Sequence, residues 1–305
     1  MALLIVVTII VVFPIPYVAF PNTAQDAINN AELMVTSQSI LVPSMKNFQL
    51  EQTTVFVTNS SERATLDPWD GSLCLAPDCR TPFVRVRVPG AQAGSGTQIQ
   101  ISNTAEIINV TEFNKYTRMA LGRDEYNFYL VGKGMLHKGA WPATTVAYNK
   151  KITMRGLQHD VLPNHHSPLG KRHQGKRTIS IPNPSVSQFE LGDLTMNMSV
   201  DGMPVGTASL PNVFIAAGNN SIPMTATTNV MAVAGLVSGP YKSGVLPVDV
   251  VVTSVIYDGE HIPWYEQALA ALSLRLDLGV IPALQESGLA GIPGLGAAFV
   301  WADVT

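Results

Sequence analysis

The chain is poor in charged residues, and this scarcity limits the classes of protein to which it can belong. Only 13% of its 305 residues are Asp, Glu, Lys or Arg, whereas 46% are hydrophobic. This composition is unusual for a cytosolic protein and favours a membrane or secretory setting. The formal net charge of −3 is too close to neutral to indicate a nucleic-acid partner.

The sequence also lacks the familiar motifs of catalysis and cofactor binding. It contains no G-x-S-x-G, no phosphate-binding G-x-x-x-x-G-K-[ST], no G-x-G-x-x-G and no H-E-x-x-H. Acidic pairs such as Asp124/Glu125 and Asp258/Glu260 lie beside predicted turns, where solvation accounts for them. We therefore predict a non-enzymatic protein with no catalytic, cofactor-binding or metal-binding residues.

Cysteine is scarce as well, with only Cys74 and Cys79 present. Pro77-Asp78 lies between them and has the chemistry of a turn, so a small disulfide-closed loop is geometrically allowed. Two free buried thiols are the alternative interpretation. A metal site would need more ligands nearby than the sequence offers.

Charge is missing altogether from residues 1–20, where Thr8 is the only polar side chain. Twenty helical residues at ~1.5 Å rise span about 30 Å, the thickness of the hydrocarbon layer. Prolines interrupt the second half, and no positive segment precedes it as in a signal peptide. We predict a single transmembrane or signal-anchor segment over 1–20, with a buried core helix as the alternative. The first charges that follow are Asp26 and Glu32, and no lysine occurs before Lys46, so this flank fits the non-cytosolic side.

Beyond this segment the dominant pattern is alternation of period two, which is typical of half-buried strands. It appears from Val84 to Val88, where valine alternates with arginine, and again from Leu194 to Val200. Asp201-Gly202 and Asp258-Gly259 supply hairpin turns. The period becomes helical between Phe113 and Ala120, where Thr111 is the predicted cap, and a second helix is predicted from Pro263 to Leu272.

These patterns predict a mainly β protein made of two tandem Ig/fibronectin-like β-sandwiches, each with a short helix. The predicted order is the membrane segment (1–20), a connector (21–38), the first sandwich (39–157), an exposed linker (158–177), the second sandwich (178–275) and an apolar Gly/Pro-rich tail (276–305).

The linker holds four of the six histidines: His159, His165, His166 and His173. A loop of this composition holds a metal ion poorly, so solvation is the favoured interpretation of these histidines and of the neighbouring basic residues. Its dibasic pairs, Lys171-Arg172 and Lys176-Arg177, suggest a processing site as a hypothesis.

Asn-x-Ser/Thr acceptor sequences for N-glycosylation occur at Asn59, Asn109, Asn197 and Asn219. Asn197 lies on the polar face of a predicted strand, and Asn219 lies in a predicted turn. Both placements suit glycan attachment in a secretory lumen. Trp69, Trp141, Trp264 and Trp301 are interpreted as core and helix-docking anchors, with a groove lining as the alternative.

One stretch carries a family resemblance. Asn183-Pro184, the strand ending at Val200-Asp201-Gly202, Val205-Gly206 and Gly218-Asn219-Asn220-Ser221 together resemble the group 2 late-embryogenesis-abundant domain. The chain is also similar to an uncharacterised fungal family of membrane-anchored proteins built from such domains, one of them a vacuolar-membrane protein implicated in terminating autophagy.

The resemblance implies a vacuolar membrane protein, or secondly a cell-surface one, with most of the chain in the lumen. We expect such a protein to bind partners or the membrane surface without catalysing a reaction. Lipid binding or lipid transfer is the alternative, and a hydrolase on a β-sandwich is a third, for which no motif is present. The expected partners are the membrane and lipid.

Overall fold

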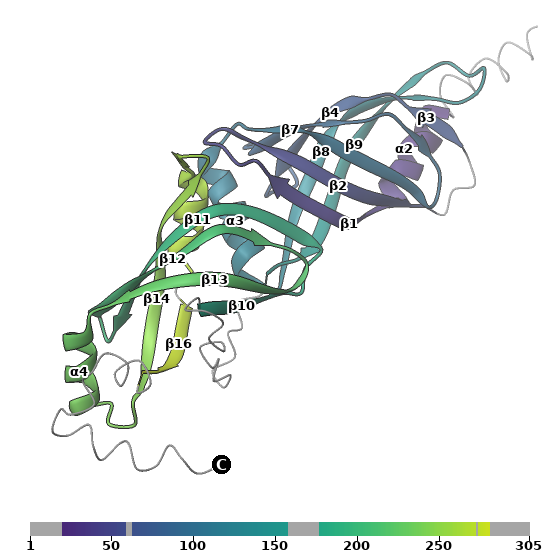
Figure 1. The fold of residues 1–305 in the computed structure, drawn as a ribbon. Helices are drawn as coiled ribbons and strands as arrows, with labels where there is room; N and C mark the ends of the chain where they lie inside the picture. The colour runs from purple at the N-terminus through teal and green to yellow at the C-terminus, as the bar shows by residue number, and fades with distance from the viewer. Residues whose placement is uncertain (1–19, 59–62, 158–176, 273, 281–305) are drawn as a thin grey trace, which may run out of the picture. The chain divides into compact units, whose positions relative to one another are not determined.

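The computed structural model describes residues 20–58, 63–157, 177–272 and 274–280. The protein is mainly β, which confirms the predicted class. Its contacts divide into two compact units (Figure 1). Unit 1 contains the described residues up to Gly156 together with Ser185–Phe189, and unit 2 contains Leu157–Pro184 and the described residues from Glu190 onward. Within the described ranges, the helices are too short or too polar to cross a bilayer.

Unit 1 is a curled antiparallel sheet with two helices. Its strands are β1 (Glu32–Leu41), β2 (Asn47–Val57), β3 (Ala64–Leu66), β4 (Trp69–Cys74), β5 (Val84–Val88), β6 (Ala91–Ala93), β7 (Thr97–Ile107), β8 (Glu125–His137) and β9 (Thr144–Arg155). The hydrogen-bonded order is β1-β2-β7-β5-β4-β8-β9, and the short β3 pairs with β6 and β8. The sheet curls until β9, at one end, lies beside β1 at the other.

Helix α3 (Val110–Gly122) covers an aromatic cluster in unit 1. Phe113 and Tyr116 face inward at helical spacing, and their rings lie within 5.5 Å of Phe48 and 5.0 Å of Phe83, respectively. The helix begins two residues earlier than predicted, because the side chain of Asn109, not Thr111, accepts the backbone N–H of Glu112 at 3.1 Å.

Helix α2 (Phe20–Asn30) closes the open edge of β9. The Gln25 amide both donates to the carbonyl oxygen of Ala147 and accepts its N–H, each at 2.8 Å, so it replaces a neighbouring strand at that residue. The buried ammonium of Lys150 donates to the carbonyl oxygens of Asn29 at 2.9 Å and Ala31 at 2.6 Å. A cation is favourable at the carboxyl end of a helix, where carbonyl groups lack helical partners.

In unit 2 the strands are hydrogen-bonded in the order β10-β13-β12-β11-β14-β16. Its elements are β10 (Arg177–Asn183), β11 (Ser187–Val200), β12 (Met203–Ile215), β13 (Gly218–Thr228), β14 (Val245–Tyr257), β15 (Glu260–His261), β16 (Leu274–Gly279), α4 (Val230–Ser238) and α5 (Pro263–Ala270). The first three residues of β11 belong to unit 1, where they pair in parallel with Gln38–Ile40 of β1.

Both predicted Asp-Gly hairpins of unit 2 are present. Asp201 and Gly202 have φ angles of 48° and 79°, and Asp258 and Gly259 have φ angles of 48° and 80°. Two successive positive φ angles match the twist of the flanking strands, and Asp-Gly reaches that conformation at little cost. Pro182 lies in β10, which within the described residues pairs with β13 alone, as expected for a residue that cannot donate to a ladder.

Several elements differ from the prediction. The predicted connector 21–38 forms most of α2 and β1, each unit has two described helices instead of one, and residues 276–279 of the predicted tail extend β16 along β14. The predicted membrane segment apart from Phe20, residues 158–176 of the linker with its histidines, and residues 281–305 lie outside the described residues. The Ig-like two-sheet arrangement stays a prediction.

Candidate functional site

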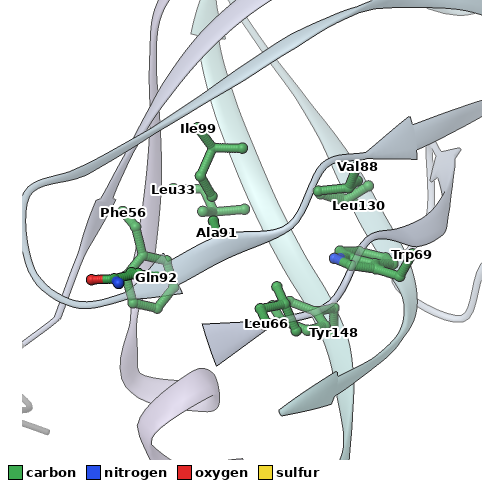
Figure 2. Close-up of a pocket in the computed structure, with 10 residues that line it drawn as sticks. All are labelled: Leu33, Phe56, Leu66, Trp69, Val88, Ala91, Gln92, Ile99, Leu130 and Tyr148. Atoms are coloured by element: carbon green, nitrogen blue, oxygen red, sulfur yellow. The ribbon is translucent and has the colours of Figure 1, made fainter. Parts of the chain in front are cut away.

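A small apolar pocket lies inside unit 1 (Figure 2). Every strand from β1 to β9 contributes to its wall, which is formed by Leu33, Phe56, Leu66, Trp69, Val88, Ala91, Gln92, Ile99, Leu130 and Tyr148. About 40 Å³ of it is open to the centre of a water-sized sphere. The floor is buried, whereas Leu33, Ala91 and Ile99 are half-buried and Gln92 is exposed, so these four form the rim.

Glycine residues create the space that the ring of Trp69 occupies. A Cβ atom on Gly132 would lie 2.2 Å from the Trp69 ring, and one on Gly134 would lie 3.3 Å from it. Tyr148 stacks on the same ring with a centroid distance of 4.6 Å. The indole is therefore fixed between the glycine stretch of β8 and the phenol ring of β9.

The indole nitrogen of Trp69 is buried and has no hydrogen-bond partner among the residues that the structure describes. The side chain is 5% exposed, and Figure 2 shows the nitrogen at the edge of the ring that points toward the middle of the pocket. Beside it, burial raises the pKa of the Tyr148 hydroxyl, which keeps the phenol neutral. The pocket thus offers one unsatisfied donor in a neutral apolar wall.

A second feature of unit 1 is a small aromatic and basic cluster at the first residue of α2. Phe20 lies 5.5 Å from Trp141 between ring centroids, and Trp141 is 40% exposed. The Lys138 ammonium is 5.9 Å from the Phe20 ring centroid and 5.8 Å from that of Trp141, within the range of cation–π attraction. We call these three residues the Trp141 cluster.

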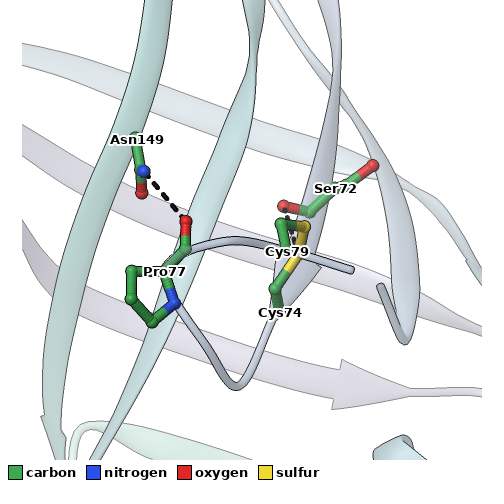
Figure 3. The surroundings of a disulfide bond; sticks show 5 residues. All are labelled: Ser72, Cys74, Pro77, Cys79 and Asn149. Atoms are coloured by element: carbon green, nitrogen blue, oxygen red, sulfur yellow. Dashed lines mark hydrogen bonds between the residues drawn. A yellow bond between two sulfur atoms is a disulfide. The ribbon is translucent and has the colours of Figure 1, made fainter. Parts of the chain in front are cut away.

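The two cysteines are joined as a disulfide in unit 1 (Figure 3). The bond closes the turn after β4, where the Cys79 N–H donates to the carbonyl oxygen of Ala76 at 3.1 Å. The side-chain amide of Asn149 in β9 donates to the carbonyl oxygen of Pro77 at 2.9 Å. This loop is thereby tied both to its own strand and to β9.

The candidate glycosylation residues occupy different environments. Asn197 on β11 and Asn219 on β13 are exposed. Asn109 is half-buried, and its side-chain oxygen accepts the Glu112 N–H that caps α3, whereas an N-glycan is attached to the amide nitrogen. Asn59 lies outside the described residues.

A buried polar network crosses the interior of unit 1 without the features of a catalytic site. Ser187 donates to the Gln38 side-chain oxygen at 3.2 Å, and Gln38 donates to Gln52 at 3.0 Å. Tyr116 and Tyr126 join this network by hydrogen bonds, and burial raises the pKa of both phenols. Neutral hydroxyl and amide groups that bond one another are best explained as core structure.

Ionisable groups in the described ranges form pairs rather than clusters. His137 lies 2.8 Å from Asp67, and His261 lies 2.6 Å from Glu266. Among the described residues there is no group of three or more His, Cys, Asp or Glu side chains placed to hold a metal ion.

Two asparagines of the stretch from Asn183 to Ser221, Asn183 and Asn220, stabilise turns through their side chains. Asn183, 2% exposed, donates to the carbonyl oxygen of Ala216 at 3.0 Å. Asn220 accepts the N–H of Ala216 at 2.9 Å and donates to the carbonyl oxygen of Ile181 at 3.1 Å. These bonds connect β10 with the β12–β13 turn, so the motif has a structural role in unit 2.

The environments of the tryptophans were only partly predicted from the sequence. Trp69 and Trp264 are buried, as predicted, and Trp69 also lines the pocket, which was the alternative. Trp141 is exposed, contrary to the prediction, and Trp301 lies outside the described residues. The signal that could have identified the pocket is the Gly132-Lys133-Gly134 triplet within a strand, because interior glycines often mark a close approach of another group.

Comparisons with known proteins give one family match. A model described as a protein of unknown function (DUF3712) matches residues 81–198, which include β5 to β10 and most of β11. No curated protein matches the chain.

Solved structures that are similar to the chain include the following three, each with a very low TM-score. The periplasmic chaperone SfaE is 16% identical, with 81% of this chain and 100% of that one covered and a TM-score of 0.17. The Escherichia coli chaperone DraB is 13% identical, with 81% and 98% covered and a TM-score of 0.19. A Porphyromonas gingivalis W83 protein of unknown function is 8% identical, with 81% and 97% covered and a TM-score of 0.18. Similarity at this level carries no argument about function.

Proposed function

We propose that the chain is a non-enzymatic, membrane-anchored protein that exposes units 1 and 2 in a vacuolar or secretory lumen and binds the membrane surface or partners there. The vacuolar membrane is the first location proposed and the cell surface the second. Kinship with the group 2 late-embryogenesis-abundant domains and the fungal membrane-anchored family is part of this proposal.

The observation that carries the proposal is the position of the Trp141 cluster. Phe20 packs on the exposed ring of Trp141 and directly follows a stretch of sequence that contains no charged residue. Tryptophan favours the boundary between hydrocarbon and water, because its ring is apolar and its N–H is polar. The Lys138 ammonium beside the rings is suited to anionic headgroups.

Quenching by brominated lipids tests this placement. The full chain carrying Trp301→Phe is reconstituted into vesicles whose lipids bear bromine near the headgroups, and tryptophan emission is recorded. Trp69 and Trp264 are buried at 5% and 1% exposure, so Trp141 should account for the quenching. Adding Trp141→Phe should abolish most of it. Equal quenching with and without Trp141 would rule out contact between this cluster and the membrane.

Lumenal exposure is supported by the disulfide, since such bonds persist in oxidising compartments. It is supported further by the exposed sites at Asn197 and Asn219. Full-length protein from a eukaryotic host should move faster on a gel after removal of N-glycans, and Asn197→Gln or Asn219→Gln should each reduce that change. Unchanged mobility of the parent chain would count against a lumenal location.

Lipid binding is the second candidate function, and the pocket in unit 1 is the observation that favours it. Its walls are apolar, and its rim is partly exposed. The volume suits the end of one hydrocarbon chain rather than a whole lipid, since sites for drug-sized ligands enclose roughly 300 Å³ or more. A binding site for part of an apolar molecule fits these dimensions better than a transfer cavity.

A further inference from the structure

We propose that the pocket in unit 1 selects a small apolar group that carries a hydrogen-bond acceptor, such as a ketone, ester or ether oxygen, and that the Trp69 indole N–H is the donor that recognises it. This inference rests on the second candidate function and adds the polar atom that the ligand must present.

The argument begins with the cost of an unsatisfied donor. A buried polar group that lacks a hydrogen bond destabilises a protein, and most buried groups of this kind are paired. Trp69 is 5% exposed, and its nitrogen is unpaired among the described residues. An oxygen atom of a bound ligand would satisfy it.

The surroundings of the indole explain why its orientation is fixed. Adding a Cβ atom at Gly132 or Gly134 would crowd the ring, and Tyr148 stacks on it with an interplanar angle of 18°. The ring therefore cannot turn to find another partner without displacing β8 or Tyr148. A fixed donor that points into an apolar space is a specificity element, because it discriminates between molecules of equal shape.

The remaining wall defines the rest of the ligand. Leu66, Val88 and Leu130 present only carbon atoms to the pocket. The volume of about 40 Å³ is roughly three times the ~10–15 Å³ that a single water needs on this measure. A fragment of a few carbons with one oxygen fits that space, and a charged group would find no counter-ion in the pocket wall as described.

The test uses the full chain with ¹⁵N-labelled tryptophan, which gives one indole signal for each of the four tryptophans. Trp69→Phe assigns the signal of interest. The probes are 2-pentanone and n-pentane, which have the same chain length and differ in one oxygen. Leucine methyl signals, with Leu66 assigned by Leu66→Val, report entry into the pocket independently of the donor.

The expected result is that both probes shift the Leu66 methyl signals, whereas only 2-pentanone moves the Trp69 indole proton downfield. In Trp69→Phe, the ratio of the affinities for 2-pentanone and n-pentane should fall about fivefold, as expected for the loss of one neutral hydrogen bond. The exposed-site variant Trp141→Phe should leave both affinities unaltered.

Two outcomes overturn the inference. If both probes shift the methyl signals and neither moves the Trp69 indole signal, Trp69 is not the selective donor, although the pocket still binds apolar groups. If neither probe shifts the methyl signals, both this inference and the second candidate function fail. If the Trp69 indole proton stays bonded to an internal water when 2-pentanone is present, the indole signal does not move. That result is an instance of the first outcome.

Discussion

Unit 1 and unit 2 fill their interiors with different kinds of side chain. Among the described residues, aromatic rings make up 11 of the 32 buried hydrophobic side chains of unit 1, whereas Trp264 and Tyr265 are the only aromatic residues among the 24 of unit 2. Rigid rings fit together only where neighbours make room, and in unit 1 glycines on β4 and β8 provide that room around Trp69. Flexible aliphatic chains adapt to irregular space instead. The difference teaches that a core rich in aromatic rings can hold a pocket whose shape is fixed.

The strongest test of this comparison removes an aromatic ring from the mainly aliphatic unit. Trp264 is 1% exposed and lies at 3.8 Å from Tyr265 between ring centroids on α5. Trp264→Ala should lower the free energy of unfolding by about 3–5 kcal/mol, because it leaves a large cavity. Urea unfolding of the full chain in detergent, followed by circular dichroism, measures it. Trp141→Ala, at a site 40% exposed, is the control, and a loss equal to that of the control would contradict the role of Trp264 as an anchor.

A smaller effect is expected when a methyl group is added in unit 1. The Cβ atom of Gly132→Ala would lie 2.2 Å from the Trp69 ring and 2.9 Å from the Asp70 carbonyl oxygen, so the ring must move. Overpacking of this kind costs about 1–3 kcal/mol, and the near-ultraviolet circular dichroism of Trp69 should change with it. The control is Gly94→Ala, whose Cβ atom would have only the Thr97 hydroxyl nearby, at 3.7 Å, so the free energy of unfolding should hardly change. Equal stability of the two variants would show that Trp69 is not fixed by Gly132.

The smallest change is expected from pH and concerns the tyrosines of unit 1. Burial raises the pKa of Tyr116, Tyr126 and Tyr148 above the ordinary value of about 10. Above that pH the unfolded chain loses phenol protons that the folded chain retains, so the free energy of unfolding falls as pH rises. Tyr148→Phe keeps the ring that stacks on Trp69 and removes one ionisable group. Between pH 10 and 11, the free energy of unfolding of Tyr148→Phe should therefore fall less than that of the parent chain. An identical fall in the two chains would contradict burial of this phenol.

Local chemistry explains which parts of the fold were predictable. Asp201-Gly202 and Asp258-Gly259 encode their turns within two residues, and the alternation from Val84 to Val88 marks one buried face. Helix α4 was missed because its sequence is apolar on nearly all sides and shows little periodicity, although Asn229 caps it by accepting the Ala232 N–H at 3.1 Å.

The candidate site was not predictable, because its parts come from strands that are distant in the sequence. Trp69 and Gly132 are brought together only by the pairing of β4 with β8, in which Gly71 lies opposite Gly132. No periodicity within either strand indicates that pairing. The parallel contact of β1 with the start of β11 has the same origin, since Gln38 and Ser187 lie in register through the folded sheet alone.

The Gln25 side chain has a consequence for how unit 1 resists self-association. Its amide occupies the donor and acceptor of Ala147 that an incoming strand from another molecule would use. Detachment of α2 would uncover this template while the sheet behind it stayed intact. Loss of α2 would leave the N–H and the carbonyl oxygen of Ala147 unpaired at the edge of β9, and unpaired strand edges are the groups through which other strands can add to a sheet.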